Sequence, residues 1–472
     1  MNALTPDAAA ATLLAAQRAA HATDPTPTHA VRIDRLDRLA RLLEENAQAF
    51  VQAITQDFGH RSAHETLLAE VGILGTSIVG TKRHLKGWMK TRRVATSLAY
   101  MPGRNRLIRQ PLGVVGVVAP WNYPLQLSLG PAIGAIAAGN RVLIKPSELT
   151  PAFSALLEKL VGQYFKPEEM AVVCGDAQVG AAFCALPFDH LVFTGSTAVG
   201  RKVAAAAAPN LTPLTLELGG KSPCIIDSSA DLKVAAPRIA FGKLLNAGQT
   251  CIAPDYLLVP PGQGRAVAEA LKAEVARMYP TIEGNPDYTS IISPRHRARL
   301  QQLLDDAQSQ GATIVPLSDD LTPQGSRKFT PVAVLNPTPS MQIMQEEIFG
   351  PLLPIVEVAD TAAAIAKVNA GDRPLALYWF GSDGAAREQV LRETIAGGVT
   401  INDCLWHIGQ EAQPFGGVGA SGMGAYHGEH GFRSFSKEKP VFIQARLNGI
   451  PLLHPPYGKT FAFMLKVLKL IA

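Results

Sequence analysis

The chain has 472 residues, more than the roughly 250–300 at which a single hydrophobic core stops growing, so two or three domains are expected. Hydrophobic residues make up 47% of the chain and charged residues 18%, which is typical of a folded globular protein and not of a disordered one. The net charge is +5, and lysine and arginine are scattered among aspartate and glutamate without a basic stripe, so nucleic-acid binding is disfavoured.

The first predicted elements are helices. Apolar residues recur at helical spacing over 33–58, and a second helical stretch covers 65–90. Residues 93–112 then contain the turn sequence Met101-Pro102-Gly103-Arg104 between two alternating stretches, which predicts an inserted hairpin. An arm that leaves a domain in this way often pairs with another subunit.

From Gly113 onward, short apolar runs alternate with helical segments. This alternation predicts a parallel sheet with helices on its faces, and such sheets bind ligands beyond the carboxyl ends of their strands. After Gly220 a second alternating region begins, which we interpret as a second α/β domain. The predicted strands of the first region lie at 113–119, 141–144, 170–174, 190–194 and 214–218. The predicted helices of the second region lie near 230–247, 264–278, 295–310, 361–370 and 384–395.

Polar or glycine-rich segments follow several of the predicted strands. They are Pro120-Trp121-Asn122-Tyr123-Pro124, Lys145-Pro146-Ser147-Glu148, Gly195 to Gly200 and Glu217-Leu218-Gly219-Gly220. The segment that begins with Gly195 and Ser196 opens a helix, which favours a pyrophosphate at the helix N-terminus. It lacks the middle glycine of GxGxxG. The complete GxGxxG at 417–422 follows no predicted strand, so we interpret it as a loop.

Lys145 and Glu148 are candidates to hydrogen-bond a ribose at the end of the second strand. A solvated lysine and a glutamate at a helix N-terminus are the alternatives.

The five cysteines are odd in number, widely spaced and free of CxxC pairs, which is typical of a reducing compartment and predicts no metal site. The N-terminus lacks a secretory pattern, and no stretch approaches the ~20 apolar residues of a membrane span, so we expect a cytoplasmic protein.

Cys251 differs from the other four cysteines because it ends the polar, glycine-containing turn that begins at Asn246. A nucleophilic cysteine needs an exposed position and a positive or hydrogen-bonding setting, and a structural cysteine is the alternative.

Two residues at the strand ends are candidate partners of Cys251. Glu217 ends an apolar strand, where a carboxylate is unfavourable unless it is used or paired. It is a candidate general base for the hydrolysis of a covalent intermediate, and a salt-bridged structural glutamate is the alternative. The amide of Asn122 is a candidate oxyanion donor together with the Cys251 backbone N–H, unless it only holds the turn.

Six ordered motifs resemble those of the aldehyde dehydrogenase superfamily over nearly the whole chain. They are Pro120-Trp121-Asn122, Phe193-Thr194-Gly195-Ser196, Leu216-Glu217-Leu218-Gly219-Gly220-Lys221-Ser222-Pro223, Gly248-Gln249-Thr250-Cys251, Glu346-Glu347-Ile348-Phe349-Gly350-Pro351 and Pro414-Phe415-Gly416-Gly417. The chain length and the run at 422–428 are similar to the class 3 branch. Asp57-Phe58-Gly59, the run at 251–256 and Pro455-Pro456-Tyr457-Gly458 are similar to bacterial coniferyl aldehyde dehydrogenases.

The resemblance implies an α/β aldehyde dehydrogenase fold, with two doubly wound α/β domains, a small oligomerisation hairpin arm and a homodimer. The implied regions are dinucleotide binding at 1–92 and 113–219, catalysis at 220–410, oligomerisation or bridging at 93–112 and 411–450, and an apolar tail at 451–472.

The resemblance also assigns roles. Cys251 would be the nucleophile, Glu217 the general base and Asn122 an oxyanion donor. The implied cofactor contacts are Lys145 and Glu148 at the adenosine ribose, Gly195 and Ser196 at the pyrophosphate, and Glu347 at the nicotinamide ribose beside Phe349 and Trp121.

The implied reaction is oxidation of an aldehyde, such as the aromatic coniferaldehyde, to a carboxylic acid through a thioester. A carboxylate at Glu148 would accept from a ribose 2′-OH and repel a 2′-phosphate, so NAD is favoured, although class 3 enzymes often accept NADP as well. One alternative is a fatty aldehyde dehydrogenase of the same class. A CoA-acylating semialdehyde dehydrogenase is disfavoured by Glu217, and a non-catalytic module would be expected to lack one of the three catalytic positions.

The C-terminal residues 461–472 are apolar except for Lys466 and Lys469, and they are too few to span a bilayer. Docking on the enzyme's own or a partner's surface is favoured, and peripheral contact with a membrane is the alternative.

Overall fold

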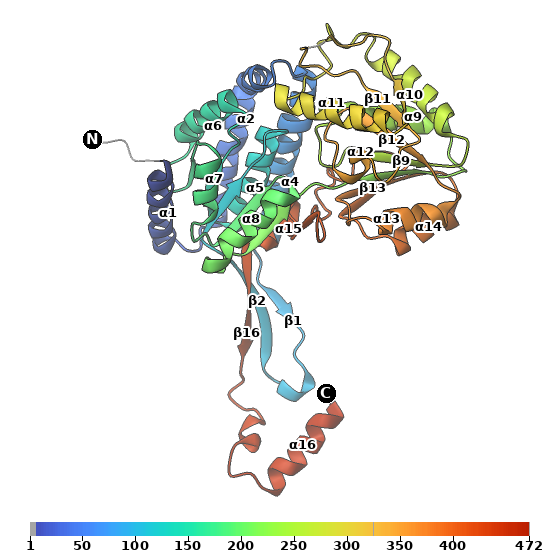
Figure 1. Cartoon of the computed structure of the whole chain (residues 1–472). Helices are drawn as coiled ribbons and strands as arrows, with labels where there is room; N and C mark the ends of the chain where they lie inside the picture. Colours follow the sequence, from blue (N-terminus) through green and yellow to red (C-terminus); the bar gives the residue numbers. More distant parts are fainter. Residues whose placement is uncertain (1–5, 324, 472) are drawn as a thin grey trace.

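The computed structural model describes residues 6–323 and 325–471, which contain three β-sheets (Figure 1). The first sheet has the strand order β15-β7-β6-β3-β4-β5, and all of its pairs are parallel except β15 with β7. The predictions of five strands between residues 113 and 218 are therefore confirmed. The strands of this sheet are β3 (Val114–Val118), β4 (Arg141–Lys145), β5 (Met170–Val172), β6 (His190–Thr194), β7 (Leu214–Glu217) and β15 (Gly422–Met423).

Helices cover both faces of the first sheet, because successive side chains of its apolar strands point to opposite sides. Val115 and Val117 of β3 belong to the core under α2, α5 and α6, whereas Val114 belongs to the core under α1 and α7. The helices around this sheet are α1 (Pro6–Thr23), α2 (His29–Phe58), α3 (Ala63–Thr66), α4 (Ile73–Trp88), α5 (Pro124–Ala138), α6 (Pro151–Tyr164), α7 (Ala177–Cys184), α8 (Thr197–Ala207) and the short turn η3 (Ala208–Asn210).

The helical stretch predicted over 65–90 is confirmed, since helical segments cover 63–88 without a break. A π-helical turn, η1 (Leu67–Gly72), separates α3 from α4. This turn contains Glu70, whose carboxylate reaches buried partners on other elements. Hydrophobic spacing does not reveal such a turn, because the apolar residues on either side keep their helical period.

The second sheet has the strand order β10-β11-β12-β9-β8-β13-β14, and all of its pairs are parallel except β10 with β11. The five helices predicted after Gly220 are confirmed to within a few residues. The strands are β8 (Pro223–Ile226), β9 (Tyr256–Val259), β10 (Thr313–Pro316), β11 (Val332–Leu335), β12 (Leu352–Glu357), β13 (Ala376–Phe380) and β14 (Gly398–Ile401). The helices are α9 (Leu232–Leu244), η4 (Leu245–Gly248), α10 (Gly264–Met278), α11 (Pro294–Ser309), α12 (Gln342–Gln345), α13 (Thr361–Asn369) and α14 (Gly384–Glu393).

The third sheet forms an arm that projects from the rest of the molecule (Figure 1). The predicted hairpin is present as an antiparallel pair of β1 and β2, and β16 pairs along the whole of β2. Residues 422–434 of the segment predicted as bridging lie in the body, since β15 joins the first sheet and α15 packs on α4 and α5. These elements are β1 (Arg92–Val94), η2 (Leu98–Tyr100), β2 (Arg104–Pro111), α15 (Gly428–Ser434) and β16 (Ser436–Ile443).

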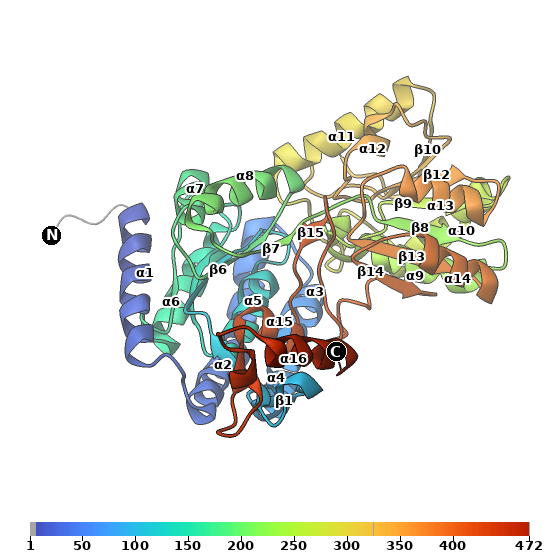
Figure 2. The same ribbon diagram turned by 90° about the horizontal axis from the view of Figure 1, so that it is seen from below.

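The C-terminal tail forms η5 (Ile450–Leu453) and α16 (Lys459–Ile471), which lie beside the tip of the arm (Figures 1 and 2). Helix α16 contacts η5 and η2, so the tail packs against the arm of its own chain. Several of its apolar side chains remain exposed, among them Phe463 and Leu470. Among the described residues, no helix combines the length and the hydrophobicity that a membrane crossing requires.

Candidate active site

A cavity of about 1190 Å³ is lined by residues from both large sheets. The first sheet contributes the segments after β3, β6 and β7, as expected for the carboxyl ends of parallel strands. The second sheet contributes segments that precede β9 and β12, which strand-end reasoning did not predict. Eight predicted site residues line this cavity: Trp121, Asn122, Gly195, Ser196, Glu217, Cys251, Glu347 and Phe349.

Lys145 and Glu148 are not among the residues that line the cavity. The buried ammonium of Lys145 donates to the backbone oxygen of Pro146 and, over 3.2 Å, to the carboxylate of Glu148. The ion pair therefore lies at the end of β4, beside β3, and its two members contact each other.

Cys251 follows a tight turn that leaves its thiol half-buried in the cavity wall. Asn246 and Ala247 both have left-handed backbone conformations, with φ of 56° and 51°, which are unfavourable for residues with a side chain. Gly248 is also left-handed, and a Cβ there would lie 2.4 Å from the backbone oxygen of Gly350. The turn is thus held against the segment that carries Glu347 and Phe349.

Burial, together with the smaller effect of the nearby carboxyls of Glu347 and Glu217, raises the pKa of the Cys251 thiol to about 12. The backbone N–H groups of Cys251 and Ile252 oppose this by stabilising the thiolate. The expected hydrogen-bonding setting is therefore present, but it does not outweigh burial. A thiol in this setting needs a proton acceptor, or an added positive charge, before it becomes a nucleophile.

Asn122 is buried in the loop between β3 and α5 and lines the cavity. Its side-chain amide donates to the backbone oxygen of Gln249, 3.1 Å away, in the Cys251 turn. An amide nitrogen carries two hydrogens, so one remains for a ligand oxygen. This bond ties the candidate oxyanion donor directly to the turn that holds the candidate nucleophile.

Glu217 is 3% exposed and lies at the last position of β7, where it lines the cavity. Neither carboxyl oxygen has a hydrogen-bond partner among the described residues, so the salt-bridged alternative does not apply. Burial raises the pKa of this carboxyl well above its ordinary value. An unpaired buried carboxyl beside a cavity is typical of a group that exchanges protons with a ligand.

Glu347 contacts the chain where it passes from β7 to β8. A Cβ on Gly219 would lie 2.0 Å from the Glu347 carboxyl, so only glycine allows this approach. Lys221 adds a second link, because its ammonium pairs with Asp255 and donates to the backbone oxygen of Glu346. Burial and the charge of Asp255 raise the pKa of Glu347 to about 8, although a Gly220 hydrogen bond opposes them.

Gly219→Ala is expected to displace the Glu347 carboxyl and to weaken binding of a nicotinamide cofactor by about tenfold or more, a loss of ~1.4 kcal/mol. The dissociation constant can be measured by titrating the intrinsic fluorescence of the protein with NADH. Gly75→Ala in α4 is the control, because its Cβ would meet no atom within 4 Å. Equal dissociation constants for the two variants would show that Glu347 does not contact the cofactor.

The site also fits the phosphate groups of a dinucleotide. Ser196 is the N-cap of α8, and its hydroxyl accepts a hydrogen bond from the Val199 backbone N–H. Free N–H groups at the start of a helix attract phosphate, and Arg201 of the same helix also lines the cavity. The GxGxxG motif is a loop over 417–421, as predicted, and its last glycine, Gly422, begins β15. A Cβ on Gly422 would lie 2.2 Å from the Leu216 backbone oxygen, so glycine there allows close packing on β7.

Sequence reasoning missed a buried charged cluster behind the cavity, formed by Arg61, Glu65 and Glu70. Tyr123 bonds Thr250 over 2.7 Å, and Trp121 makes an edge contact with Phe349 at a centroid distance of 5.4 Å. Arg61 and the two glutamates near it are separated in sequence from every motif. Charged residues on an otherwise apolar helical stretch, such as Glu70, were the available signal.

Comparisons with known proteins agree with this geometry. The family model described as the aldehyde dehydrogenase family matches residues 1–441. The chain belongs to the aldehyde dehydrogenase family. A relative from Pseudomonas aeruginosa named probable coniferyl aldehyde dehydrogenase is 51% identical over 448 residues, covering 95% of this chain and 94% of that protein. The predicted resemblance to the family and its coniferyl branch is thereby confirmed.

Two further matches come from other branches. The rat protein named aldehyde dehydrogenase, dimeric NADP-preferring, is 40% identical over 419 residues, which covers 88% of this chain and 90% of that protein. The substrate-bound structure of Staphylococcus aureus AldH superposes with a TM-score of 0.92 at 38% identity, covering 97% of this aldehyde dehydrogenase and 99% of that chain. The predicted fold is confirmed, and the enzyme is an oxidoreductase of aldehydes.

Proposed function

We propose that this aldehyde dehydrogenase oxidises an aromatic aldehyde such as coniferaldehyde to the carboxylic acid, with NAD or NADP. The observation that carries the proposal is that Cys251, Glu217 and Asn122 line one cavity. The name of the Pseudomonas aeruginosa relative supports the substrate class. The cavity walls support it too, because aromatic rings stack on flat substrates. The aromatic wall residues are Trp121, Tyr123, Tyr256, Phe349, Phe415 and Tyr426.

The first half of the reaction forms a bond to sulfur. The Cys251 thiol gives its proton to water, and the thiolate attacks the carbonyl carbon of the aldehyde. The carbonyl oxygen becomes an oxyanion, which the Asn122 amide and the Cys251 backbone N–H stabilise. When bound, the oxidised nicotinamide supplies a positive charge that favours the thiolate and accepts the hydride that leaves the same carbon. Cys251 then carries a thioester.

The second half hydrolyses the thioester. The carboxylate of Glu217 takes a proton from water, and the resulting oxygen attacks the thioester carbon. The same two donors stabilise the second oxyanion. The carbon–sulfur bond then breaks, so that the carboxylic acid leaves and the Cys251 thiolate is regenerated, and Glu217 returns its proton to solvent. Glu217 suits this role because it is buried, lies at the cavity and has no hydrogen-bond partner in the part of the chain that the structure describes.

Cofactor binding is proposed for the residues that the motifs indicated. Ser196 and the start of α8 would hold the pyrophosphate, and Glu347 would hold the nicotinamide ribose. Glu148 would contact the adenosine ribose and favour NAD by repelling a 2′-phosphate. Lys145 neutralises part of that repulsion, since the two side chains form an ion pair. This pairing and the NADP-preferring relative favour use of both cofactors.

We also retain the predicted homodimer and the domain roles as proposals. The arm exposes apolar side chains that a second subunit would cover, including Leu98, Tyr100 and Phe442. The rat relative named dimeric supports the same assembly.

The test is a panel of aldehydes, with reduced cofactor followed by absorbance. Coniferaldehyde is expected to give a kcat/KM at least about tenfold above that of decanal, because the aromatic walls discriminate by shape, with benzaldehyde between them. The acid is the expected product, and free CoA is expected not to change the rate. A preference for decanal would indicate a fatty aldehyde dehydrogenase, and an acyl-CoA product would contradict hydrolysis by Glu217.

A further inference from the structure

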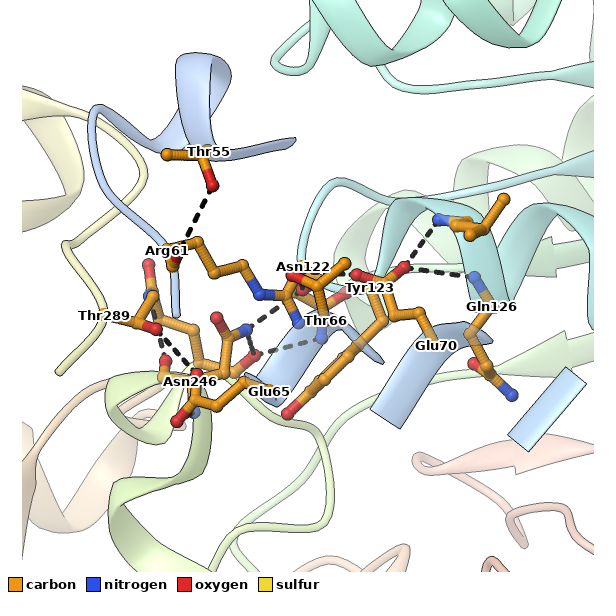
Figure 3. Close-up of polar contacts among 12 residues, drawn as sticks. Thr55, Arg61, Glu65, Thr66, Glu70, Asn122, Tyr123, Gln126, Asn246 and Thr289 are labelled. Atoms are coloured by element: carbon orange, nitrogen blue, oxygen red, sulfur yellow. Dashed lines mark hydrogen bonds and ion pairs between the residues drawn. The ribbon is translucent and has the colours of Figure 1, made fainter. Parts of the chain in front are cut away.

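We propose that Arg61, Glu65 and Glu70 form a buried positioning network that holds Asn122 and the Cys251 turn in one arrangement (Figure 3). None of the three is among the residues that line the cavity, so they act through other groups and do not touch the substrate. The inference rests on the proposed function, because it assumes that Asn122 is an oxyanion donor.

The centre of the network is an ion pair between Arg61 and Glu70. Both side chains are fully buried, and Arg61 Nη1 lies 2.7 Å from Glu70 Oε1. Arg61 Nη1 also donates to the backbone oxygen of Asn122 over 3.1 Å. Buried ion pairs are often no more stabilising than apolar residues of the same size, because both charges lose their hydration. Fold stability alone is therefore a weak reason for this pair.

The second oxygen of Glu70 holds the start of α5. It accepts hydrogen bonds from the backbone N–H groups of Leu125 at 2.7 Å and Gln126 at 3.1 Å. A carboxylate in this place satisfies free donors of the first helical turn and interacts favourably with the helix dipole. The π-helical turn that contains Glu70 places it there, and such turns often occur at functional sites. The loop of Asn122 is thus fixed from both sides.

Glu65 holds the other loop. Its Oε1 accepts from the backbone N–H of Asn246 at 3.1 Å, and its Oε2 accepts from the hydroxyl of Thr289 at 2.6 Å. Asn246 has the left-handed backbone that begins the Cys251 turn, and its side chain donates to the backbone oxygen of Asn122 over 3.0 Å. The Asn122 oxygen therefore accepts from both Arg61 and Asn246.

Through these bonds, one short segment of the chain holds both the Asn122 loop and the Cys251 turn. Glu65 and Glu70 lie on adjoining turns, in α3 and η1, and each holds the backbone of a different loop. The loops meet at Asn122, whose side-chain amide also bonds the Cys251 turn. A misplacement of about 1 Å in a catalytic group can cost ~10²-fold in rate, so a loosened Asn122 is expected to slow catalysis with little change in cofactor binding.

The experiment is a cycle of variants measured with saturating cofactor. Arg61→Met combined with Glu70→Gln removes both charges together, and glutamine retains an oxygen for the α5 amides. We expect kcat to fall about 10- to 100-fold and the KM values to change less than about threefold. In an Asn122→Ala background, the same replacement is expected to change kcat by less than about twofold. An equal loss in both backgrounds would overturn the proposal.

Arg38→Met combined with Glu169→Gln is the matched control. It removes another ion pair next to the first sheet, with Nη1 and Oε2 2.8 Å apart and no bond to Asn122. Its kcat is expected to equal that of the unaltered enzyme, even where thermal denaturation shows a lower melting temperature. A fall in kcat that follows melting temperature in both pairs would indicate a structural role only and would refute positioning.

Glu65 provides a second test in case the paired variant does not fold. Glu65→Gln can still accept from Asn246 and donate to the Thr289 oxygen, so we expect near-normal kcat, whereas Glu65→Ala is expected to lose at least about tenfold. Glu65→Ala should also change the rate at which iodoacetamide alkylates Cys251, without any cofactor. Equal behaviour of the two variants would refute the role of Glu65. Full activity of Asn122→Ala would instead refute the proposed function.

Discussion

Cys251→Ala is expected to abolish aldehyde oxidation, with kcat lowered on the order of 10⁴-fold or more, because the proposed covalent intermediate forms on this sulfur and no other cysteine of the described residues lines the cavity. The variant should still fold, since alanine removes only one half-buried sulfur from a cavity wall. Reduced cofactor formed from coniferaldehyde is the measurement of rate, and NADH titration shows whether cofactor binding survives.

Cys174→Ala is the control for this prediction. Cys174 is also half-buried, and burial raises its pKa to about 11, but it is not among the residues that line the cavity. Its replacement is expected to leave kcat unchanged. Normal turnover by Cys251→Ala would mean that the thioester pathway is wrong for this enzyme.

Glu217→Gln is expected to slow hydrolysis of the thioester by about 10²- to 10⁴-fold, the range typical of a lost general base. Formation of the thioester should be affected far less. Mixing enzyme, cofactor and aldehyde in a stopped-flow instrument should therefore yield one equivalent of reduced cofactor per active site, followed by a slow steady state. A variant without this burst, or with steady turnover like that of the unaltered enzyme, would exclude Glu217 as the base for hydrolysis.

The same residue sets an expected pH dependence. Burial raises the pKa of Glu217 well above its ordinary value, so its proton is retained at low pH and the basic form accumulates as pH rises. Steady-state kcat of the unaltered enzyme should rise with pH, and Glu217→Gln should lack that rise. Cys251, with a pKa of about 12, and Glu347, with one of about 8, ionise in the same direction. The burst precedes hydrolysis, so the dependence of the burst rate on pH separates the contribution of Cys251 and Glu347 from that of Glu217.

Much of the fold and of the candidate site is predictable from local patterns. The strands β3 to β7 and the helices after Gly220 follow from apolar runs and their period, which depend on neighbouring residues only. The residues Asn122, Ser196 and Glu217 were found because carboxyl ends of parallel strands share one edge of a sheet. The resemblance placed Glu347 and Phe349, for which strand spacing had no rule, since they precede β12.

Other features could not be predicted from local patterns, because they depend on long-range contacts. The acidity of the Cys251 thiol is decided by burial and by Glu347 and Glu217, which come from distant parts of the chain. The π-helical turn at η1 exists where Glu70 meets Arg61 and the start of α5. Segment 422–434 joins the body because Gly422 fits closely against β7.

The sequence by itself determined the family, the order of strands and helices along the chain, and the candidates for nucleophile, base and oxyanion donor, because these reside in short motifs and local periodicity. Only the tertiary structure decided how these groups are held. Packing between α2, η1 and α5 brings Arg61, Glu70 and Asn122 together. The partners of a buried charge are the groups that the fold places within hydrogen-bond distance of it.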